Sequence, residues 1–182
     1  MAQINISVLV DADNLKANLV SGHLQPGTKG SPTSIGGNAD SDNYIYMIAK
    51  NGVVQNNQAK SELTITAGSG DQITWNMTTF SQNAPYSTFI YDSKFNLQSG
   101  TAPIGIDNVS YVNIKVGTRV PTGTAPQTDP LGQYVNTIYR TTANVTNINQ
   151  TIQYTMSFQM IDDASGAVLG YFVWDPFIII PF

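Results

Sequence analysis

The chain has 182 residues, of which eight are Lys or Arg, twelve are Asp or Glu, one is His and none is Cys. This length predicts a single domain over residues 1–182 with an adequate core. The absence of Cys excludes disulfides, thiol nucleophiles and zinc sites built from Cys. The net charge of -4 provides no basic surface that could neutralise a phosphate backbone, so we expect no nucleic-acid partner.

The first residues, MAQINISVLVDADN, lack the charged start and the apolar stretch of about 7 to 15 residues that a secretion signal needs. We therefore expect synthesis for the cytoplasm. No run reaches the roughly 18 apolar residues that cross a bilayer, because Asp175 and Pro176 interrupt the apolar C-terminal segment. No membrane span is expected.

Short runs of β-branched and aromatic residues, separated by Gly, Pro, Asn and Asp, alternate with polar residues at a period of two. This pattern predicts an all-β fold, an antiparallel β-sandwich of the jelly-roll or Greek-key type with long polar loops. The first expected strands are residues 4–10, 44–49, 63–66, 72–77, 88–91 and 111–116. The exception is a short helix over residues 14–19, capped by Asp13. The long polar loops are residues 21–42 and 121–132.

The clearest strand signal covers residues 151–161, where apolar and polar side chains alternate without a break. A half-solvated antiparallel strand has this pattern. Residues 162–166, with the sequence DDASG, have the length and composition of a turn, and residues 167–174 alternate again. We expect 151–161 and 167–174 to pair as a β-hairpin.

Two Asp-x-Asp-Asn tetrapeptides, residues 11–14 and 40–43, flank the first long loop. In an extended segment residues i and i+2 lie on one face, so two carboxylates would repel each other unless a cation lay between them. Ca²⁺ takes six to eight oxygens, which a loop of Asp, Asn and Ser can supply. The candidate metal ligands are Asp11, Asp13, Asp40 and Asp42, and the candidate ligand-binding residues beside them are Asn14 and Asn43.

The same residues have two other interpretations. Asp and Asn at strand ends often cap helices or form Asx-turns. Alternatively, Asp11 with Asp13 or Asp42 could act as the carboxyl pair of a glycoside hydrolase, in which the two groups stand about 5 to 9 Å apart. Since His23 lies in a polar loop and no GxSxG motif is present, no serine triad is expected. We assign no catalytic residue.

Trp75 lies between Thr74 and Asn76 in a polar run, so its ring could fill the core or face a ligand. Polar loops with Asp, Asn and an aromatic ring have the general character of a carbohydrate site, because sugars need arrays of oxygen and amide partners. Trp75 is therefore a third candidate ligand-binding residue.

Three segments together indicate a family. INISVLVDADNLKAN, DNYIYMIAKNG and LGYFVWDPFIII, in this order and spacing, resemble the bacterial AidA/PixA family of inclusion-body proteins. The resemblance covers nearly the whole chain. It implies a compact β-sandwich of unassigned catalytic activity, made in the cytoplasm of a host-interacting bacterium and sometimes accumulated in inclusions. We therefore expect a protein made in the cytoplasm, with inclusions or non-classical release as its further localisation. The family motif includes positions matching Asp11, Asp13 and the Trp174, Asp175, Pro176 run, without assigning them a role.

These observations favour a non-enzymatic, lectin-like protein that binds carbohydrate through its acidic loops, with Ca²⁺ as a possible cofactor. The alternative is a storage or structural protein that associates with itself as a homo-oligomer. The apolar end, residues 177–182, could then dock on a neighbouring copy. A carboxylate-dependent glycoside hydrolase is the third hypothesis.

Overall fold

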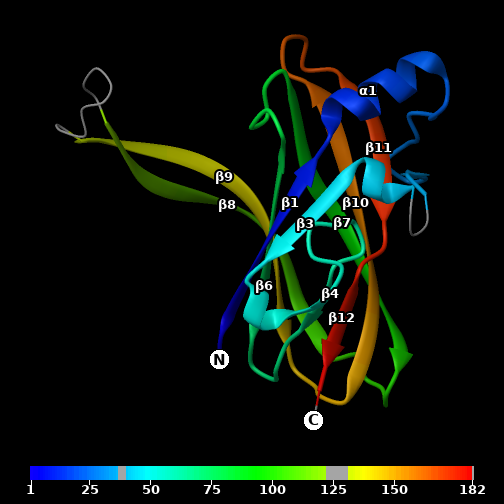
Figure 1. Cartoon of the computed structure of the whole chain (residues 1–182), viewed down its shortest axis with the longest axis vertical. Coiled ribbons are helices and arrows are strands. Elements are labelled where there is room, and N and C mark those ends of the chain that lie inside the picture. The colour runs from blue at the N-terminus through cyan, green and yellow to red at the C-terminus, as the bar shows by residue number, and fades with distance from the viewer. Residues whose placement is uncertain (37–39, 122–130, 182) are drawn as a thin grey trace.

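The computed structural model describes residues 1–36, 40–121 and 131–181. In these residues two β-sheets pack against each other, and a helix follows the first strand at one end of the sandwich (Figure 1). The all-β sandwich expected from the sequence is therefore confirmed.

The first sheet has the strand order β3-β1-β6-β9-β8. Its strands are β1 (Gln3–Val10), β3 (Ile45–Ala49), β6 (Gln72–Thr79), β8 (Ile106–Pro121) and β9 (Leu131–Val145). Along β1, exposed and buried side chains alternate, because one face of the sheet covers the core and the other meets solvent. β1 pairs with β3 in antiparallel and with β6 in parallel orientation, so the sheet is mixed rather than purely antiparallel.

The second sheet is organised around β10 (Gln150–Asp162). β7 (Tyr86–Ser99) pairs with β10 along one edge, while β12 (Phe177–Ile180) and β11 (Val168–Trp174) pair with successive parts of the other. The remaining strands are β2 (Thr33–Ser34), β4 (Val54–Asn56) and β5 (Thr64–Thr66). β2 and β5 run parallel to their neighbours β11 and β12, which makes this sheet mixed as well.

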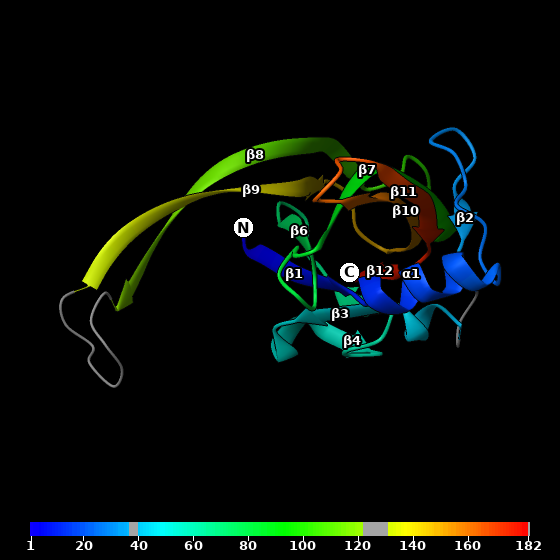
Figure 2. The same cartoon turned by 90° about the horizontal axis from the view of Figure 1, so that it is seen from above.

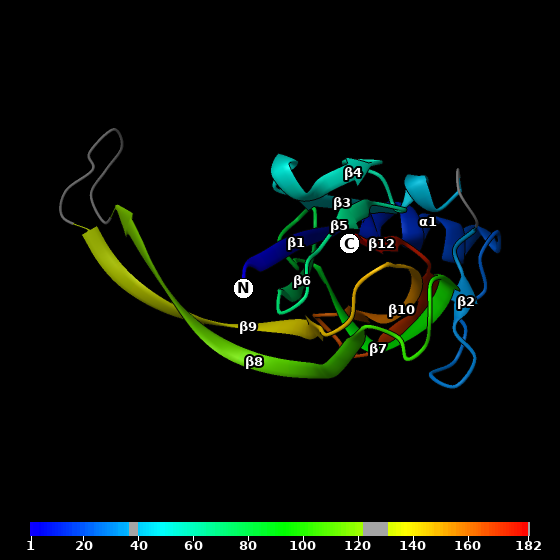
Figure 3. The same cartoon turned by 90° about the horizontal axis from the view of Figure 1, so that it is seen from below.

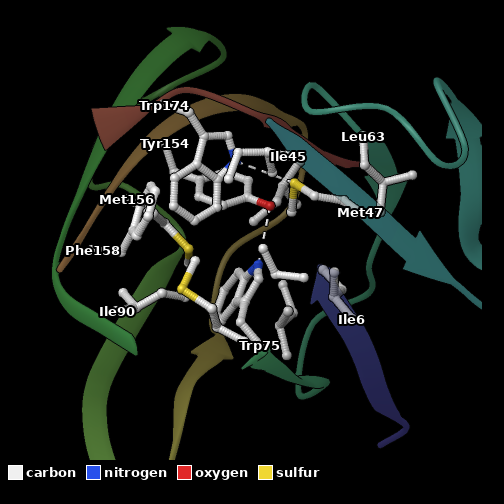
Figure 4. Close-up of a cluster of buried hydrophobic side chains, with 14 of the residues drawn as sticks. Ile6, Ile45, Met47, Leu63, Trp75, Ile90, Tyr154, Met156, Phe158 and Trp174 are labelled. Carbon is white, nitrogen blue, oxygen red and sulfur yellow. Dashed lines mark hydrogen bonds between the residues drawn. The ribbon is translucent and has the colours of Figure 1, made fainter. Parts of the chain in front are cut away.

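Between the sheets lies a core of aliphatic, aromatic and methionine side chains (Figure 4). Its largest fully buried members are Trp75, Trp174, Tyr154, Phe158 and Phe172. Trp75 comes from the first sheet, and the others come from the second. Two hydrogen bonds of indole N–H groups, to the Tyr154 hydroxyl and to the Met47 sulfur, join the sheets inside this core.

The long β8–β9 hairpin extends beyond the sandwich and is called the arm below. β8 and β9 pair from Ile106 and Val145 at the root to Pro121 and Leu131. Figures 2 and 3 show that the two strands leave the body on the side of the first sheet that faces away from the second, and then curve. The segment that joins their far ends, residues 122–130, lies outside the described residues, as does most of the expected loop 121–132.

Most sequence predictions of secondary structure are confirmed. The expected strands 4–10, 44–49, 63–66 and 72–77 correspond to β1, β3, β5 and β6. The expected hairpin is formed by β10 and β11, in which Phe158 pairs with Phe172. The strands expected at 88–91 and 111–116 are parts of the much longer β7 and β8.

Three predictions need correction. The helix α1 (Ala12–Ser21) starts earlier than expected, and its N-cap is Asp11 rather than Asp13. β9, which lies in a segment rich in Thr and Asn, is not predicted. The apolar C-terminal run is also not a free end: Phe177–Ile180 forms β12, with Ile178 and Ile180 buried between neighbouring strands. Both edges of β12 are paired, with β10 on one side and β5 on the other.

Candidate functional site

The two acidic tetrapeptides lie side by side in the fold. The backbone N–H of Asp11 donates to the Tyr44 carbonyl at 2.8 Å, and the Asn14 side-chain amide donates to the Asn43 carbonyl at 3.0 Å. The pairing of β1 with β3 causes this proximity, because the first tetrapeptide follows β1 and the second precedes β3. The fold thus brings together the two segments that the sequence singled out as candidate ligands.

Their carboxylates, however, serve separate local roles. Asp11 Oδ1 accepts the backbone N–H of Asn14 at 3.0 Å and so caps α1. A cap of this kind stabilises a helix by about 1 kcal/mol. Asp13 is exposed in the first turn of α1, where a negative charge is favourable next to the helix N-terminus. Asp11 is therefore a helix cap, as the alternative interpretation of the tetrapeptides proposed.

Asp42 is held by the segment that precedes β5. Its Oδ1 accepts hydrogen bonds from the backbone N–H and the hydroxyl of Ser61, both at 2.8 Å, and its Oδ2 lies 3.4 Å from the Lys60 ammonium. Burial by itself would raise the pKa of Asp42, but the Ser61 hydrogen bonds and the Lys60 charge outweigh it and keep that pKa below its ordinary value. Asp40 is exposed just before the 3₁₀ turn Ser41–Asn43.

Within residues 1–36, 40–121 and 131–181, no three His, Asp or Glu side chains are grouped closely enough to hold a metal ion. Asp11 Oδ1 and Asp42 Oδ1 each accept a backbone N–H, from Asn14 and from Ser61 respectively. Calcium binding by these tetrapeptides stays a prediction.

Trp75, the expected ligand-facing ring, is instead a core residue. Its side chain is 0% exposed, and its indole N–H donates to the Tyr154 hydroxyl at 3.1 Å (Figure 4). The polar neighbours that suggested a surface position belong to the same strand, in which Thr74 is also fully buried. A ligand on the surface cannot reach Trp75 in this arrangement.

The C-terminal Trp-Asp-Pro run is likewise structural. Trp174 is buried and donates its indole N–H to the Met47 sulfur at 3.4 Å. Asp175 Oδ2 accepts a hydrogen bond from the Gln153 amide at 2.8 Å, and partial burial raises the pKa of this carboxyl above its ordinary value despite that bond.

A cleft of about 610 Å³ opens at the root of the arm. β9 pairs with β6 only from Gln72 to Trp75, so beyond Trp75 the two strands separate and leave space between them. β7 and the turn before it complete the walls. The lining residues are Asn76, Met77, Thr78, Gln82, Asn83, Ser87, Thr88, Phe89, Asn113, Asn136, Thr137, Ile138 and Tyr139. No local sequence pattern indicates this cleft, since its lining combines residues 76–89 with Asn113 and residues 136–139.

The arm has two chemically different faces. Thr141 pairs with the core residue Trp75, so it lies on the core side of the sheet, and every second residue of β9 before it continues that side. Together with its β8 partners, this face of the arm is mainly polar, with Asn113, Lys115, Arg119, Gln133, Val135, Thr137 and Tyr139.

The opposite face, called the apolar face below, continues the outer surface of the first sheet. Its apolar residues are Val112, Ile114, Val116, Val120, Tyr134 and Ile138. Tyr134, Val120 and Ile138 are 52%, 40% and 37% exposed. In the sandwich the apolar side chains face the core, whereas along the arm they lie on the opposite side of the sheet. The alternation of apolar residues from Val112 to Val116 was a sequence signal for this face.

The charges of the arm and of the remaining chain are opposite in sign. Residues 106–145 contain three basic residues and two acidic ones, a net charge of +1. Since the whole chain has a net charge of -4, the remaining residues have a net charge of -5. The basic residues of the arm are Lys115, Arg119 and Arg140. Among the described residues of the arm, 106–121 and 131–145, the only acidic one is Asp107 at its root.

In the parts of the chain that the structure describes, no helix has the length and apolar character needed to cross a bilayer. The two packed mixed sheets define a β-sandwich protein. More particularly, the chain belongs to the PixA family of inclusion body proteins, whose family model matches residues 2–180. The resemblance found in the sequence is thereby confirmed. The family is not a known enzyme family.

Among solved structures, the crystal structure of a PixA inclusion body protein from Burkholderia cenocepacia J2315 is similar to this chain. The TM-score is 0.69, the match covers 98% of this chain and 95% of that one, and 15% of the residues are identical. At this identity the likeness concerns the fold alone. A search of curated proteins found no significant match.

Proposed function

We propose that this protein is a non-enzymatic, self-associating component of bacterial inclusions, and that the arm of one copy docks on the body of another. The observation that carries the proposal is the apolar face of the arm. It exposes Val120, Tyr134 and Ile138 on a hairpin that projects away from its own sandwich. Membership of the inclusion body family supports self-association over the other hypotheses.

The physical reason for association is the burial of this face. Removing apolar surface from water stabilises a contact by roughly 25 cal/mol per Å². The arm is an extended two-stranded ribbon, and its apolar face can lie flat on a second sheet, as the two layers of a sandwich do. Within one chain the sandwich already has its second layer, so a second copy is the natural partner.

The outer surface of the first sheet is a suitable acceptor on that second copy. It exposes Ile48 and Phe80, at 40% and 55%, and the Phe80 ring packs 5.1 Å from that of Tyr46. This acceptor belongs to the body, whose net charge is negative, whereas the net charge of the arm is positive, so the arm of one copy and the body of another attract each other at long range. Because donor and acceptor differ, each copy can give one arm and receive another, and assembly can continue without closing.

The experiment compares two variants of adjacent arm residues by sedimentation velocity over a range of concentrations. Tyr134→Glu places a charge on the apolar face, and we expect it to abolish concentration-dependent association. Gln133→Glu adds the same charge on the opposite face, where it changes the net charge of the arm equally but leaves the apolar face intact, so it should weaken association much less than Tyr134→Glu. A wild type that stays monomeric at every concentration, or a Tyr134→Glu variant that assembles normally, would overturn the proposal.

A second pair tests the acceptor. Phe80→Ala removes an exposed ring from the outer surface of the first sheet and should weaken association by about tenfold or more, as the loss of a central aromatic contact does. Val168→Ala, at an exposed apolar position of the second sheet, should have no effect. Equal effects of both substitutions would show that the arm docks elsewhere.

A further inference from the structure

We infer that the cleft at the root of the arm binds a neutral saccharide unit. This inference concerns a site other than the acidic tetrapeptides and does not depend on self-association. It rests on three properties of the cleft: the chemistry of its lining, a buried hydroxyl without a partner, and a pair of aromatic rings at its wall.

The lining is polar but uncharged. Five of its side chains are amides, those of Asn76, Gln82, Asn83, Asn113 and Asn136, and none of the described lining residues is Asp, Glu, Lys or Arg. An amide offers both donors and an acceptor, which is what a hydroxyl group requires of its neighbours. A charged ligand would find no counter-ion in this lining, so a neutral polyhydroxylated ligand fits best. The volume of about 610 Å³ lies within the usual range for small-molecule sites.

Thr88 supplies an observation that points to an absent partner. It lines the cleft and is 3% exposed, yet its Oγ1 has no hydrogen-bond partner among the described residues. A buried hydroxyl left unpaired costs about 1 to 3 kcal/mol. A ligand hydroxyl bound in the cleft would remove that cost by pairing with Thr88 Oγ1.

Two aromatic rings complement these polar groups. Phe89 of β7 and Tyr139 of β9 both line the cleft, with ring centroids 5.3 Å apart and planes inclined at 62°. Sugar rings have apolar C–H faces in addition to their hydroxyls, and aromatic rings provide the matching apolar surface. Both rings are half-buried.

The turn beside the cleft is fixed by hydrogen bonds. Asn83 Oδ1 accepts the backbone N–H groups of Thr79 at 3.0 Å and Thr88 at 3.4 Å, and the Asn83 N–H donates to the Thr79 hydroxyl at 2.7 Å. These bonds connect the end of β6 to β7 across the cleft wall. A wall held in this way needs little ordering on binding, which favours measurable affinity for a small ligand.

The experiment uses free D-glucose, D-galactose, D-mannose and N-acetylglucosamine as neutral probes, with glucosamine and N-acetylneuraminic acid as charged comparators. Saturation-transfer NMR and thermal unfolding of the full chain measure binding. We expect at least one neutral sugar to bind and the charged comparators to bind more weakly. Absence of binding by all four neutral sugars would overturn the inference, as would a preference for a charged comparator.

Three variants locate the site. Phe89→Ala should weaken binding by about tenfold, corresponding to 1.4 kcal/mol, while Phe80→Ala removes an exposed ring outside the cleft and should leave it unchanged. Thr88→Val keeps the shape of the side chain and removes only the hydroxyl, so it should weaken binding while the free protein unfolds at the same or a higher temperature. A misfolded variant would show the opposite shift. Sugar binding that Thr88→Val and Phe89→Ala leave intact would place it elsewhere.

The inference and the proposed function fail separately. Tyr134→Glu, which should block assembly, changes a residue outside the cleft and should bind the sugar like the wild type. Loss of sugar binding in Tyr134→Glu would mean that the ligand site requires the assembled protein, contrary to this inference.

Discussion

Trp75 and Tyr154 are joined by a hydrogen bond across the two sheets, from the indole N–H to the phenolic oxygen at 3.1 Å, and both side chains are 0% exposed. Their rings are also in contact, with centroids 5.4 Å apart. Burial raises the pKa of Tyr154 far above its ordinary value, although the Trp75 bond acts in the opposite direction. The hydroxyl therefore stays protonated, and the pair fixes the two sheets relative to each other.

Substituting either member of this pair should leave the polar group of the other buried without a partner. The costs of the two substitutions should therefore not add. Tyr154→Phe leaves the indole N–H buried without a partner and should lower the free energy of unfolding by about 1 to 3 kcal/mol. Trp75→Phe also leaves space in the core and should cost about 3 to 5 kcal/mol. Urea unfolding of both variants and of the double variant completes a double-mutant cycle. Strict additivity of the two costs would contradict a coupling between these residues.

The sequence predicts those strands in which buried and exposed side chains alternate, and it misses strands without that alternation. β1 and β10 alternate cleanly because one face of each lies on the core, so their periodicity is visible in the sequence. β12 lies between two neighbouring strands and has a continuously apolar sequence. The sequence alone cannot distinguish such a strand from an exposed apolar segment that binds another molecule. β9 has little periodicity of burial beyond its root, since most of its length lies outside the sandwich.

For the candidate site, the sequence marked the segments involved but not the partners of their side chains. The repeated tetrapeptide marks two segments that lie side by side in the fold, but it does not specify where each carboxylate points. The partner of Asp42, Ser61, is 19 residues away and could not be inferred from the tetrapeptide. The cleft at the root of the arm combines residues from 76 to 139, and only the tertiary fold brings them together.

Asp42 should make the protein sensitive to acid. Its pKa is lowered in the folded protein, so between that value and the unfolded value of about 3.9 the unfolded chain binds more protons. The stability contributed by Asp42 is thus complete above about pH 4 and is lost as the pH falls through the lowered pKa. Asp42→Asn should destabilise the protein by about 1 to 2 kcal/mol near pH 7 and reduce the dependence on acid.

Urea unfolding at a series of pH values measures both effects. Asp13→Asn makes the same change of charge at an exposed position of α1, and we expect it to alter stability near pH 7 by no more than about 0.5 kcal/mol. An Asp42→Asn variant that loses stability in acid as steeply as the wild type would show that other carboxyl groups determine the acid response.

Salt should weaken self-association, because the proposed contact joins a positive arm to a negative body. Raising the NaCl concentration from about 0.1 M to about 1 M shortens the Debye length from about 10 Å to about 3 Å. Wild-type association, followed by sedimentation velocity, should weaken several-fold over this range. Replacing Lys115 and Arg119 together by Gln should weaken association at low salt and flatten its salt dependence. Lys50→Gln, on the body, makes the acceptor more negative and should not weaken it. Wild-type association that grows stronger with salt would mean that apolar burial alone drives the contact.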